Sequence, residues 1–271
     1  MNDSEDPVVA GAGGRTILER MRLDGRRAVV TGGGQGIGRA YAHALGEAGA
    51  RVAVVDLDAA RATAVAAELE AKGVDALALA ADVADPEAAE RYVAAVVERW
   101  GGLEIAVQNA GINLNAAAED TTAAEWDRTF EVNVRGVFRG CQAAGRVMLD
   151  AGYGKLINTA SMASLIVPHP QCQVAYNASK SAVVQLTRTL AAEWAPRGVR
   201  VNCVSPGIIR TALIDESETL APLVAEWLGQ IPAGRLGEVT DLQAGVVYLA
   251  GEASDYMTGH NLVIEGGQTL W

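Results

Sequence analysis

The sequence predicts an α/β fold in which a single doubly wound parallel sheet carries helices on both faces. Three observations support this fold class. Short apolar runs recur along the 271 residues, turn residues follow each run, and stretches with helical periodicity separate the runs. Short β-rich runs of this kind are typical of buried parallel strands. Strands and helices in strict alternation indicate a doubly wound sheet, which binds its ligands at the carboxyl ends of the strands.

The expected elements follow the chain in order. Residues 37–48 illustrate a helix, because Ile37, Tyr41 and Leu45 fall on one apolar stripe with their alanine neighbours. The apolar runs predict strands within residues 26–34, 50–58, 75–83, 103–111, 154–161, 199–207 and 261–267. The periodic stretches predict helices at 37–48, 59–72, 86–100, 122–149, 174–195, 211–229 and 240–251. No internal repeat or second boundary interrupts them, so we expect a mobile head at residues 1–14 and one domain over 15–271.

Composition excludes several function classes. The net charge of −11 argues against binding to nucleic acid or to anionic membranes, although solubility alone also explains it. The cysteines Cys141, Cys172 and Cys203 lie far apart without CxxC spacing, and the three histidines are equally scattered. We therefore expect neither a disulfide framework nor a metal site. The acidic start and the lack of a long apolar run predict a cytoplasmic protein.

A glycine-rich segment, TGGGQGIG at residues 31–38, joins the first strand to the first amphipathic helix. Glycines let the backbone turn tightly and approach a pyrophosphate, which rests on the amides of a helix N-terminus. The spacing of Gly32, Gly36 and Gly38 is GxxxGxG rather than GxGxxG, so a plain turn is the alternative. The position between a strand and a helix favours dinucleotide binding.

Asp56 ends the second strand, eighteen residues after Gly38. A carboxylate there can accept hydrogen bonds from the ribose hydroxyls of NAD and would repel a 2′-phosphate. The alternative role is a helix cap, for which Asp58 is better placed. No arginine adjoins Asp56 in the sequence, and Gln35 in the glycine-rich segment is neutral. NAD is therefore the expected cofactor.

YNASK at residues 176–180 places Tyr176 and Lys180 one helical turn apart. A surface pair is the alternative interpretation. A free tyrosine titrates near 10, so bringing its pKa to neutral pH takes roughly 3 units, or about 4 kcal/mol. A nearby ammonium favours the phenolate. The pair therefore suggests a phenol whose proton is made easier to lose.

The motifs TGGGQGIG, NAG at 109–111, NVRG at 133–136, Ser161, YNASK and SPGIIRT at 205–211 occur together and in this order. Over residues 23–271 the chain thus resembles the short-chain dehydrogenases/reductases, whose fold is a Rossmann fold. The resemblance implies that Tyr176 is the catalytic base or acid, that Lys180 activates it, that Ser161 holds the substrate oxygen and that Asn133 belongs to a proton relay. The cofactor contacts that it implies are Gly32, Gln35, Gly36, Ile37, Gly38, Asp56, Leu57, Asp82, Val83, Asn109, Ala110, Gly111, Tyr176, Lys180, Pro206, Gly207, Ile209 and Thr211.

The resemblance implies an alcohol or ketone substrate, and the segment after Ser161 should line its pocket. PQ and Q before YNASK, together with the ending EGGQTLW, resemble the branch of the family that acts on sugar alcohols. Pro168 and Ser164 depart from that branch. Candidate substrate contacts are Ser161, Met162, Ala163, His169, Gln171 and Trp271, with Gln173 also at the expected rim. The alternatives are a carbonyl reductase of ketoacyl or steroid-type substrates and a non-enzymatic dinucleotide sensor or scaffold. The resemblance further implies a homotetramer built from paired long helices.

Overall fold

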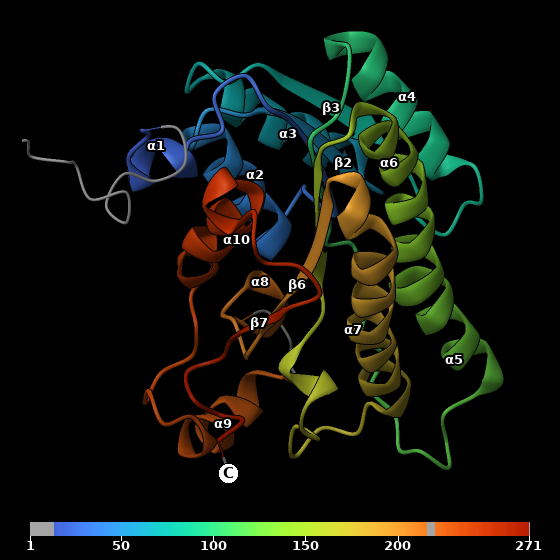
Figure 1. Ribbon diagram of the computed structural model, residues 1–271. Helices are drawn as coiled ribbons and strands as arrows, with labels where there is room; N and C mark the ends of the chain where they lie inside the picture. Colours follow the sequence, from blue (N-terminus) through green and yellow to red (C-terminus); the bar gives the residue numbers. More distant parts are fainter. Residues whose placement is uncertain (1–13, 216–219, 271) are drawn as a thin grey trace, which may run out of the picture.

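The computed structural model describes residues 14–215 and 220–270. These residues form a seven-stranded sheet in the order β3-β2-β1-β4-β5-β6-β7, and every neighbouring pair of strands is parallel. Helices lie on both faces of the sheet (Figure 1). The predicted fold class is therefore confirmed. Residues 1–13 of the expected head and Trp271 lie outside the described residues.

All seven predicted strands are present, each inside its apolar run. Their Val, Ile and Ala side chains are buried on both faces in the central strands, which explains runs that are apolar throughout rather than alternating. The strands are β1 (Arg27–Thr31), β2 (Arg51–Asp56), β3 (Ala76–Ala80), β4 (Ile105–Gln108), β5 (Gly154–Thr159), β6 (Val199–Pro206) and β7 (Asn261–Ile264).

Two apolar cores fix the helices to the sheet. On one face Tyr41 and Leu45 pack with Leu69 and Leu249, which come from α2 (Gly36–Glu47), α3 (Ala59–Glu70) and α10 (Gln243–Ala250). On the other face, the second core joins α4 (Ala88–Trp100), α6 (Val137–Ala151) and α7 (Val174–Trp194). These helices line the right-hand side of Figure 1. The chain reverses its winding direction between β1 and β4, so a crevice opens at the carboxyl ends of these two strands.

Three of the predicted helices are interrupted. Residues 122–149 contain α5 (Ala123–Phe130), a π-helical turn η1 (Glu131–Gly136) and α6. Residues 211–229 contain α8 (Ala212–Asp215), a short 3-10 turn with a proline (Ala221–Leu223) and the start of α9 (Val224–Gln230). A 3-10 turn (Val239–Leu242) precedes α10. A helix that no periodicity predicts, α1 (Ile17–Met21), is one turn long and begins with a Thr16–Glu19 capping box.

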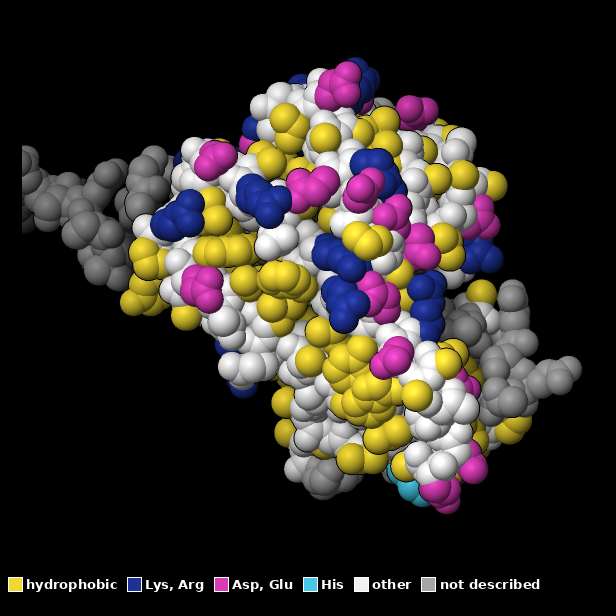
Figure 2. Space-filling model, turned by 90° about the vertical axis from the view of Figure 1, so that its right-hand side faces the viewer, with side chains coloured by type: hydrophobic (Ala, Val, Ile, Leu, Met, Phe, Trp, Pro, Cys, Tyr) yellow, Lys and Arg dark blue, Asp and Glu magenta, His cyan; other side chains and the backbone are white. Residues whose placement is uncertain are grey.

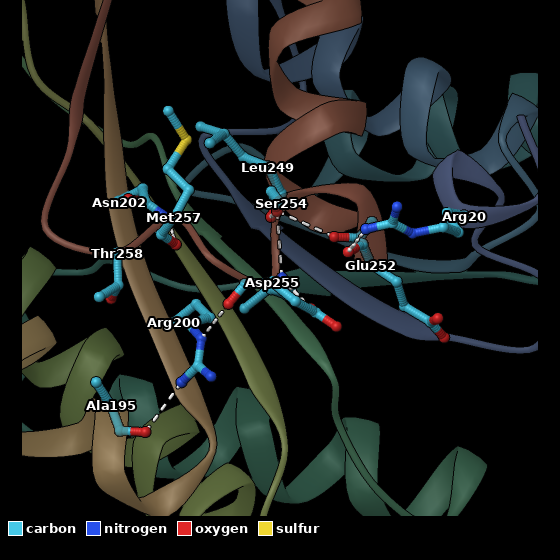
Figure 3. A network of polar contacts seen from close by, with 12 residues as sticks. Arg20, Ala195, Arg200, Asn202, Leu249, Glu252, Ser254, Asp255, Met257 and Thr258 are labelled. Carbon is cyan, nitrogen blue, oxygen red and sulfur yellow. Dashed lines mark hydrogen bonds and ion pairs between the residues drawn. The ribbon is translucent and has the colours of Figure 1, made fainter. Parts of the chain in front are cut away.

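A network of polar contacts lies at the amino-terminal ends of β5 and β6 (Figure 3). Lys155 is buried at the start of β5; its Nζ lies 2.7 Å from Asp255 Oδ1 and donates to Ser254 Oγ at 3.2 Å. Burial lowers the pKa of Lys155 below its ordinary 10.5. Arg200 of β6 donates to the Asp255 carbonyl, and Arg26 pairs with Glu252. Basic side chains from distant segments thus meet two carboxylates here.

None of the helices formed by the described residues is long and apolar enough to span a membrane.

Candidate active site

The glycine-rich loop lies at the crevice, between β1 and α2. Gly32 and Gly36 have φ values of +60° and +52°, which L side chains rarely adopt. At Gly38 a Cβ would lie 2.0 Å from the Gly32 carbonyl oxygen, so only glycine lets the helix start pack against the loop. Gln35 precedes α2 without bonding its amides, while Ile37 packs into the core. The loop therefore presents open backbone at a helix N-terminus, as pyrophosphate binding needs.

Asp56 braces this loop from the end of β2. Its Oδ2 accepts from the Gly34 amide at 2.8 Å and its Oδ1 accepts from the Asp58 amide at 3.1 Å. Asp58, not Asp56, caps α3, because its side chain accepts from two amides of that helix. The predicted cap role of Asp58 is therefore confirmed, and the ribose contact of Asp56 stays a prediction. Leu57 beside them is exposed.

Arg61 lies near Asp56 in space, although no arginine is next to Asp56 in the sequence. Arg61 of α3 donates from Nη1 to Gln35 Oε1 at 2.5 Å. A Cβ at Gly34 would lie 2.7 Å from Arg61 Cβ and 2.8 Å from Asp56 Oδ2, so both side chains border the same glycine. The helix brings Arg61 back to the loop from five positions further along the chain, which adjacency in the sequence cannot reveal.

Asn109 connects the loop to the end of β4. Its Nδ2 donates to the carbonyls of Thr31 and Gly32, and the amides of Asn109 and Ala110 donate to Thr31 Oγ1. Nearby, the Asp82 carboxylate accepts from the Ala84 amide, and a Cβ at Gly136 would lie 3.1 Å from Val83. The side chain of Asn109 thus fixes the floor of the crevice.

The SPG segment completes the crevice on the side of β6. A Cβ at Gly207 would lie 2.6 Å from Glu265 Cα, so Pro206 and Gly207 pass close to the chain after β7. Ile209 is buried and pairs with Gly237 in an isolated bridge. Thr211 Cγ2 would lie 3.6 Å from a Cβ at Gly36, which brings the segment to the glycine-rich loop.

The π-helical turn presents Asn133 to the end of β4. Its Oδ1 accepts from the Ile112 amide at 2.8 Å, and its Nδ2 donates to the Ile112 carbonyl at 2.9 Å and to Ser179 Oγ at 3.0 Å. Ser179 in turn donates to the Tyr176 carbonyl. π-turns are frequent at functional sites. Asn133 therefore ties the chain after β4 to the helix that carries Tyr176 and Lys180.

Ser161, Tyr176 and Lys180 converge above the end of β5. Ser161 caps a short helical turn by accepting from the Ala163 amide, and its hydroxyl lies near enough to Tyr176 to lower the pKa of the phenol. Lys180 is buried; its Nζ donates to the Thr159 carbonyl at 2.8 Å and lies 5.6 Å from the centroid of the Tyr176 ring. A Cβ at Gly111 would lie 3.4 Å from Lys180 Nζ. The predicted catalytic residues are thus brought together.

The pKa values of Tyr176 and Lys180 differ from what the sequence led us to expect. Burial raises the pKa of Tyr176 above its ordinary 10.0, and the nearby Ser161 hydroxyl only partly offsets this. Burial also lowers the pKa of Lys180 to about 8. Lys180 is bonded to a carbonyl rather than to the phenol, so the protein's own residues do not make the phenol more acidic.

The expected substrate segment separates into buried and surface parts. Met162 and Ala163 are buried, and Met162 packs with Trp227 and Ile231 of the α9 region. His169 Nδ1 forms a hydrogen bond with Glu226 Oε1 at 2.7 Å, and Gln171 Oε1 accepts from Trp227 Nε1 at 3.0 Å. Helix α9 therefore engages both polar side chains. Their contacts with a substrate stay predictions, and the contact expected of Trp271 lies outside the described residues.

Three residues of the site were not foreseen from the sequence. Thr159 provides the carbonyl for Lys180, Ser179 bridges Asn133 to α7, and Asn113 bonds Gln173 at 2.8 Å. Ser179 lies within YNASK, where a three-residue spacing from Tyr176 was a usable signal. A backbone carbonyl and an asparagine after NAG carry no such signal. Within residues 14–215 and 220–270 no group of His, Cys, Asp and Glu side chains is arranged to hold a metal ion.

The residues present fit a nicotinamide dinucleotide. The glycine-rich loop packs closely on its neighbours because Cβ atoms are absent, and it ends at the N-terminus of α2, where phosphates bind. The Asp56 carboxylate stands at the end of β2, where a ribose would bind. Lys180 and Tyr176 stand at the end of β5, further along the same crevice.

Comparisons with known proteins agree with this geometry. The family profile described as enoyl-(acyl carrier protein) reductase matches residues 32–269. The chain is 42% identical over 257 residues to galactitol 2-dehydrogenase (L-tagatose-forming) of Cereibacter sphaeroides, covering 95% of this chain and 99% of the relative. It is 41% identical over 249 residues to D-threitol dehydrogenase of Mycolicibacterium smegmatis, covering 92% and 95%.

Solved structures give the same result. A short-chain type dehydrogenase/reductase from Mycobacterium marinum superposes with a TM-score of 0.90 at 43% identity, covering 94% of this chain and 99% of that one. A gluconate 5-dehydrogenase from Burkholderia cenocepacia, solved with NADP and tartrate, gives 0.87 at 34% identity, covering 94% and 100%. With this fold, this crevice and these relatives, the chain belongs to the short-chain dehydrogenases/reductases, a family of oxidoreductases that act on alcohols and bind a nicotinamide cofactor.

Proposed function

We propose that this protein oxidises a small polyol or vicinal diol at a secondary carbon, using NAD⁺ and Tyr176 as the general base. The observation that carries the proposal is the convergence of Tyr176, Ser161 and Lys180 at one end of the crevice. The polyol relatives support the substrate class. Hydride transfer from an alcohol leaves a hydroxyl proton to be removed, and a placed base typically accelerates such a step ~10²–10⁴-fold.

Each residue of the group has a role that its contacts support. The Ser161 hydroxyl orients the substrate oxygen next to the Tyr176 hydroxyl, and Tyr176 takes the proton. Lys180 holds a charge beneath the ring. Asn133 bonds the Ile112 backbone through its side-chain oxygen and nitrogen, and its nitrogen also donates to Ser179 of α7. It therefore holds the chain after β4 against α7. When bound, an oxidised nicotinamide supplies the hydride acceptor and a positive charge, and that charge favours the phenolate that the protein alone does not favour.

The substrate screen measures reduction of NAD⁺ at 340 nm with C4–C6 polyols, vicinal diols and simple secondary alcohols of similar size. We expect kcat/KM to be highest for polyols or diols. Simple alcohols winning by tenfold or more would reject the polyol class and keep the dehydrogenase assignment. A carbonyl reductase would instead show efficient reduction of ketoacyl or steroid ketones with NADPH.

The NAD preference depends on Asp56, whose charge opposes a 2′-phosphate. We expect Asp56→Ser combined with Leu57→Arg to shift the ratio of kcat/KM toward NADP. Arg61 is the matched comparison, since it borders the same glycine with the opposite charge. Arg61→Ala should move the ratio toward NAD. Equal kcat/KM for both cofactors in the parent protein would contradict the role of Asp56.

We also propose that the protein assembles as a homotetramer through the face formed by α5, η1, α6 and α7. A groove of about 560 Å³ lies there, lined by Phe130, Val134, Phe138 and Leu186 with charged neighbours. Figure 2 shows a hydrophobic patch flanked by acidic and basic side chains on this side of the molecule. Light scattering at micromolar concentration should give four times the monomer mass, and a monomer would refute the assembly.

A further inference from the structure

Three amide side chains form a chain of hydrogen bonds beside the catalytic helix. Asn113 Nδ2 donates to Gln173 Oε1 at 2.8 Å, and Gln173 Nε2 donates to Asn177 Oδ1 at 2.9 Å. Gln173 is 5% exposed and precedes the first residue of α7. A backbone hydrogen bond joins the same two segments, because the Ala116 amide donates to the Cys172 carbonyl at 3.1 Å. The segment after β4 is therefore held against the start of α7.

This chain of amides lies next to the reacting groups. Gln173 is the residue before α7, and Tyr176 lies in the first turn of that helix, three residues further on. Asn113 is two residues after Gly111, where a Cβ would lie 3.3 Å from Asn133 Oδ1 and 3.4 Å from Lys180 Nζ. Asn113 itself is exposed. Asn113 thus stands at the rim of the crevice, two residues from the glycine that borders Asn133 and Lys180.

The direction of the hydrogen bonds leaves one end of the chain available. Asn113 uses its NH₂ group to bond Gln173, so its carbonyl oxygen is not used in that contact. Within the part of the chain that the structure describes, Asn113 Oδ1 accepts no hydrogen bond. An amide oxygen is a good acceptor for a hydroxyl proton. His169 and Gln171, the other polar side chains of the rim, are engaged by Glu226 and Trp227.

We propose that Asn113 is a specificity-determining residue that accepts a hydrogen bond from the substrate hydroxyl next to the reacting carbon. Gln173 is its positioning residue, because the buried amide fixes which way the Asn113 side chain points. This inference rests on the proposed alcohol oxidation and names the feature of the substrate that is recognised. A site that bonds a hydroxyl rejects the analogue without it, because its polar group is left unpaired.

The test compares two substrates that differ by one hydroxyl, 2,3-butanediol and 2-butanol. In Asn113→Leu, which is similar in size, we expect kcat/KM for the diol to fall tenfold or more, chiefly through KM. The value for 2-butanol should change less than threefold. Asn115→Leu is the matched control, since Asn115 is exposed in the same segment, and it should leave both values within twofold.

Two substitutions at Gln173 separate positioning from folding. Gln173→Glu keeps an acceptor for Asn113 Nδ2 and should retain most of the preference for the diol. Gln173→Met removes that acceptor at similar volume and should lower the diol to mono-alcohol ratio of kcat/KM severalfold. A role in stability alone would lower both rates together and leave this ratio unchanged.

Equal losses for diol and mono-alcohol in Asn113→Leu would overturn the inference, as would an unchanged ratio in Gln173→Met. In either case the parent protein would still oxidise alcohols and the proposed function would stand. Lack of turnover by the parent protein with every alcohol, diol and polyol would instead overturn the proposed function, and this inference with it.

Discussion

Two buried lysines lie near opposite ends of β5 and have different surroundings. Lys155, near the start of the strand, faces the Asp255 carboxylate at 2.7 Å and the Ser254 hydroxyl. Lys180 of α7, beyond the end of the strand, has the Thr159 carbonyl as its hydrogen-bond acceptor. Burial lowers the pKa of both. No carboxylate of the described residues pairs with Lys180.

The difference separates a structural charge from a functional one. The charge of Lys155 is compensated by the carboxylate of Asp255, which is itself half exposed. The charge of Lys180 is uncompensated beside Tyr176, which is costly for stability but useful for chemistry. Strongly perturbed, unpaired groups of this kind gather at functional sites.

The largest loss of activity is expected when Tyr176, the residue beside Lys180, is replaced. Tyr176→Phe keeps the ring and its packing but removes the proton acceptor. We expect turnover to fall by ~10²-fold or more. NAD binding, measured by fluorescence titration, should be nearly unchanged. In the parent protein, alcohol oxidation should rise with pH as the phenolate forms. More than a few per cent of the parental kcat in the variant would reject Tyr176 as the base.

Matched substitutions of the two lysines test the comparison directly. Lys180→Met should lower kcat by ~10²-fold, because the charge beneath the ring is lost. Lys155→Met should keep kcat within twofold, since Lys155 lies at the amino-terminal end of β5, away from the crevice. Comparable losses of kcat in both variants would show that Lys180 acts only through the fold.

The same variants should differ in stability as the pH changes. The pKa of Lys180 falls from 10.5 to about 8 on folding, so between these values the unfolded chain binds the extra proton. The free energy of unfolding therefore rises with pH across this window, and the full penalty applies below pH 8. Lys180→Met should be more stable than the parent at pH 7, by at most about 3 kcal/mol. Denaturant unfolding at pH 7 and 10.5 measures the gap, which should close at the higher pH; a constant gap would contradict the assignment.

A smaller effect is expected at the paired lysine. Asp255→Asn leaves the buried Lys155 charge with only a hydroxyl partner and should cost about 1–2 kcal/mol, less than a fully buried pair because Asp255 is half exposed. Lys155→Met removes that charge and should change stability by less than about 1 kcal/mol. Thermal unfolding of the two variants decides this. A greater loss in Lys155→Met than in Asp255→Asn would mean that the pair itself stabilises the fold.

The fold and the catalytic group could be predicted from the sequence because their signals are local. A buried parallel strand is a short apolar run, and Tyr176 and Lys180 are one helical turn apart. The cap role of Asp58 was also predictable, because Asp58 directly precedes the helical pattern of α3. The pairing of β4 with β5 and the nearness of Gly111 to Lys180 then follow from topology.

The remaining features depend on contacts between distant segments. Arg61 reaches Gln35 from another element, and Asn113 meets Gln173 across sixty positions. The π-helical turn within residues 122–149 has no periodicity of its own in so short a stretch. The raised pKa of Tyr176 reflects burial, which a charge pattern in the sequence does not report.

The π-helical turn at Glu131–Gly136 limits how the chain can change in length. Its wider turn holds one residue more than an α-helical turn would. A single-residue deletion that restored a regular α-helix would leave α5 and α6 in nearly their present register, because the wide turn absorbs one extra residue. It would, however, remove the wide turn that presents Asn133 to the Ile112 backbone. Insertions and deletions should therefore be tolerated in the loops around this helix but not within it, and chimeras with relatives should be joined outside residues 123–151.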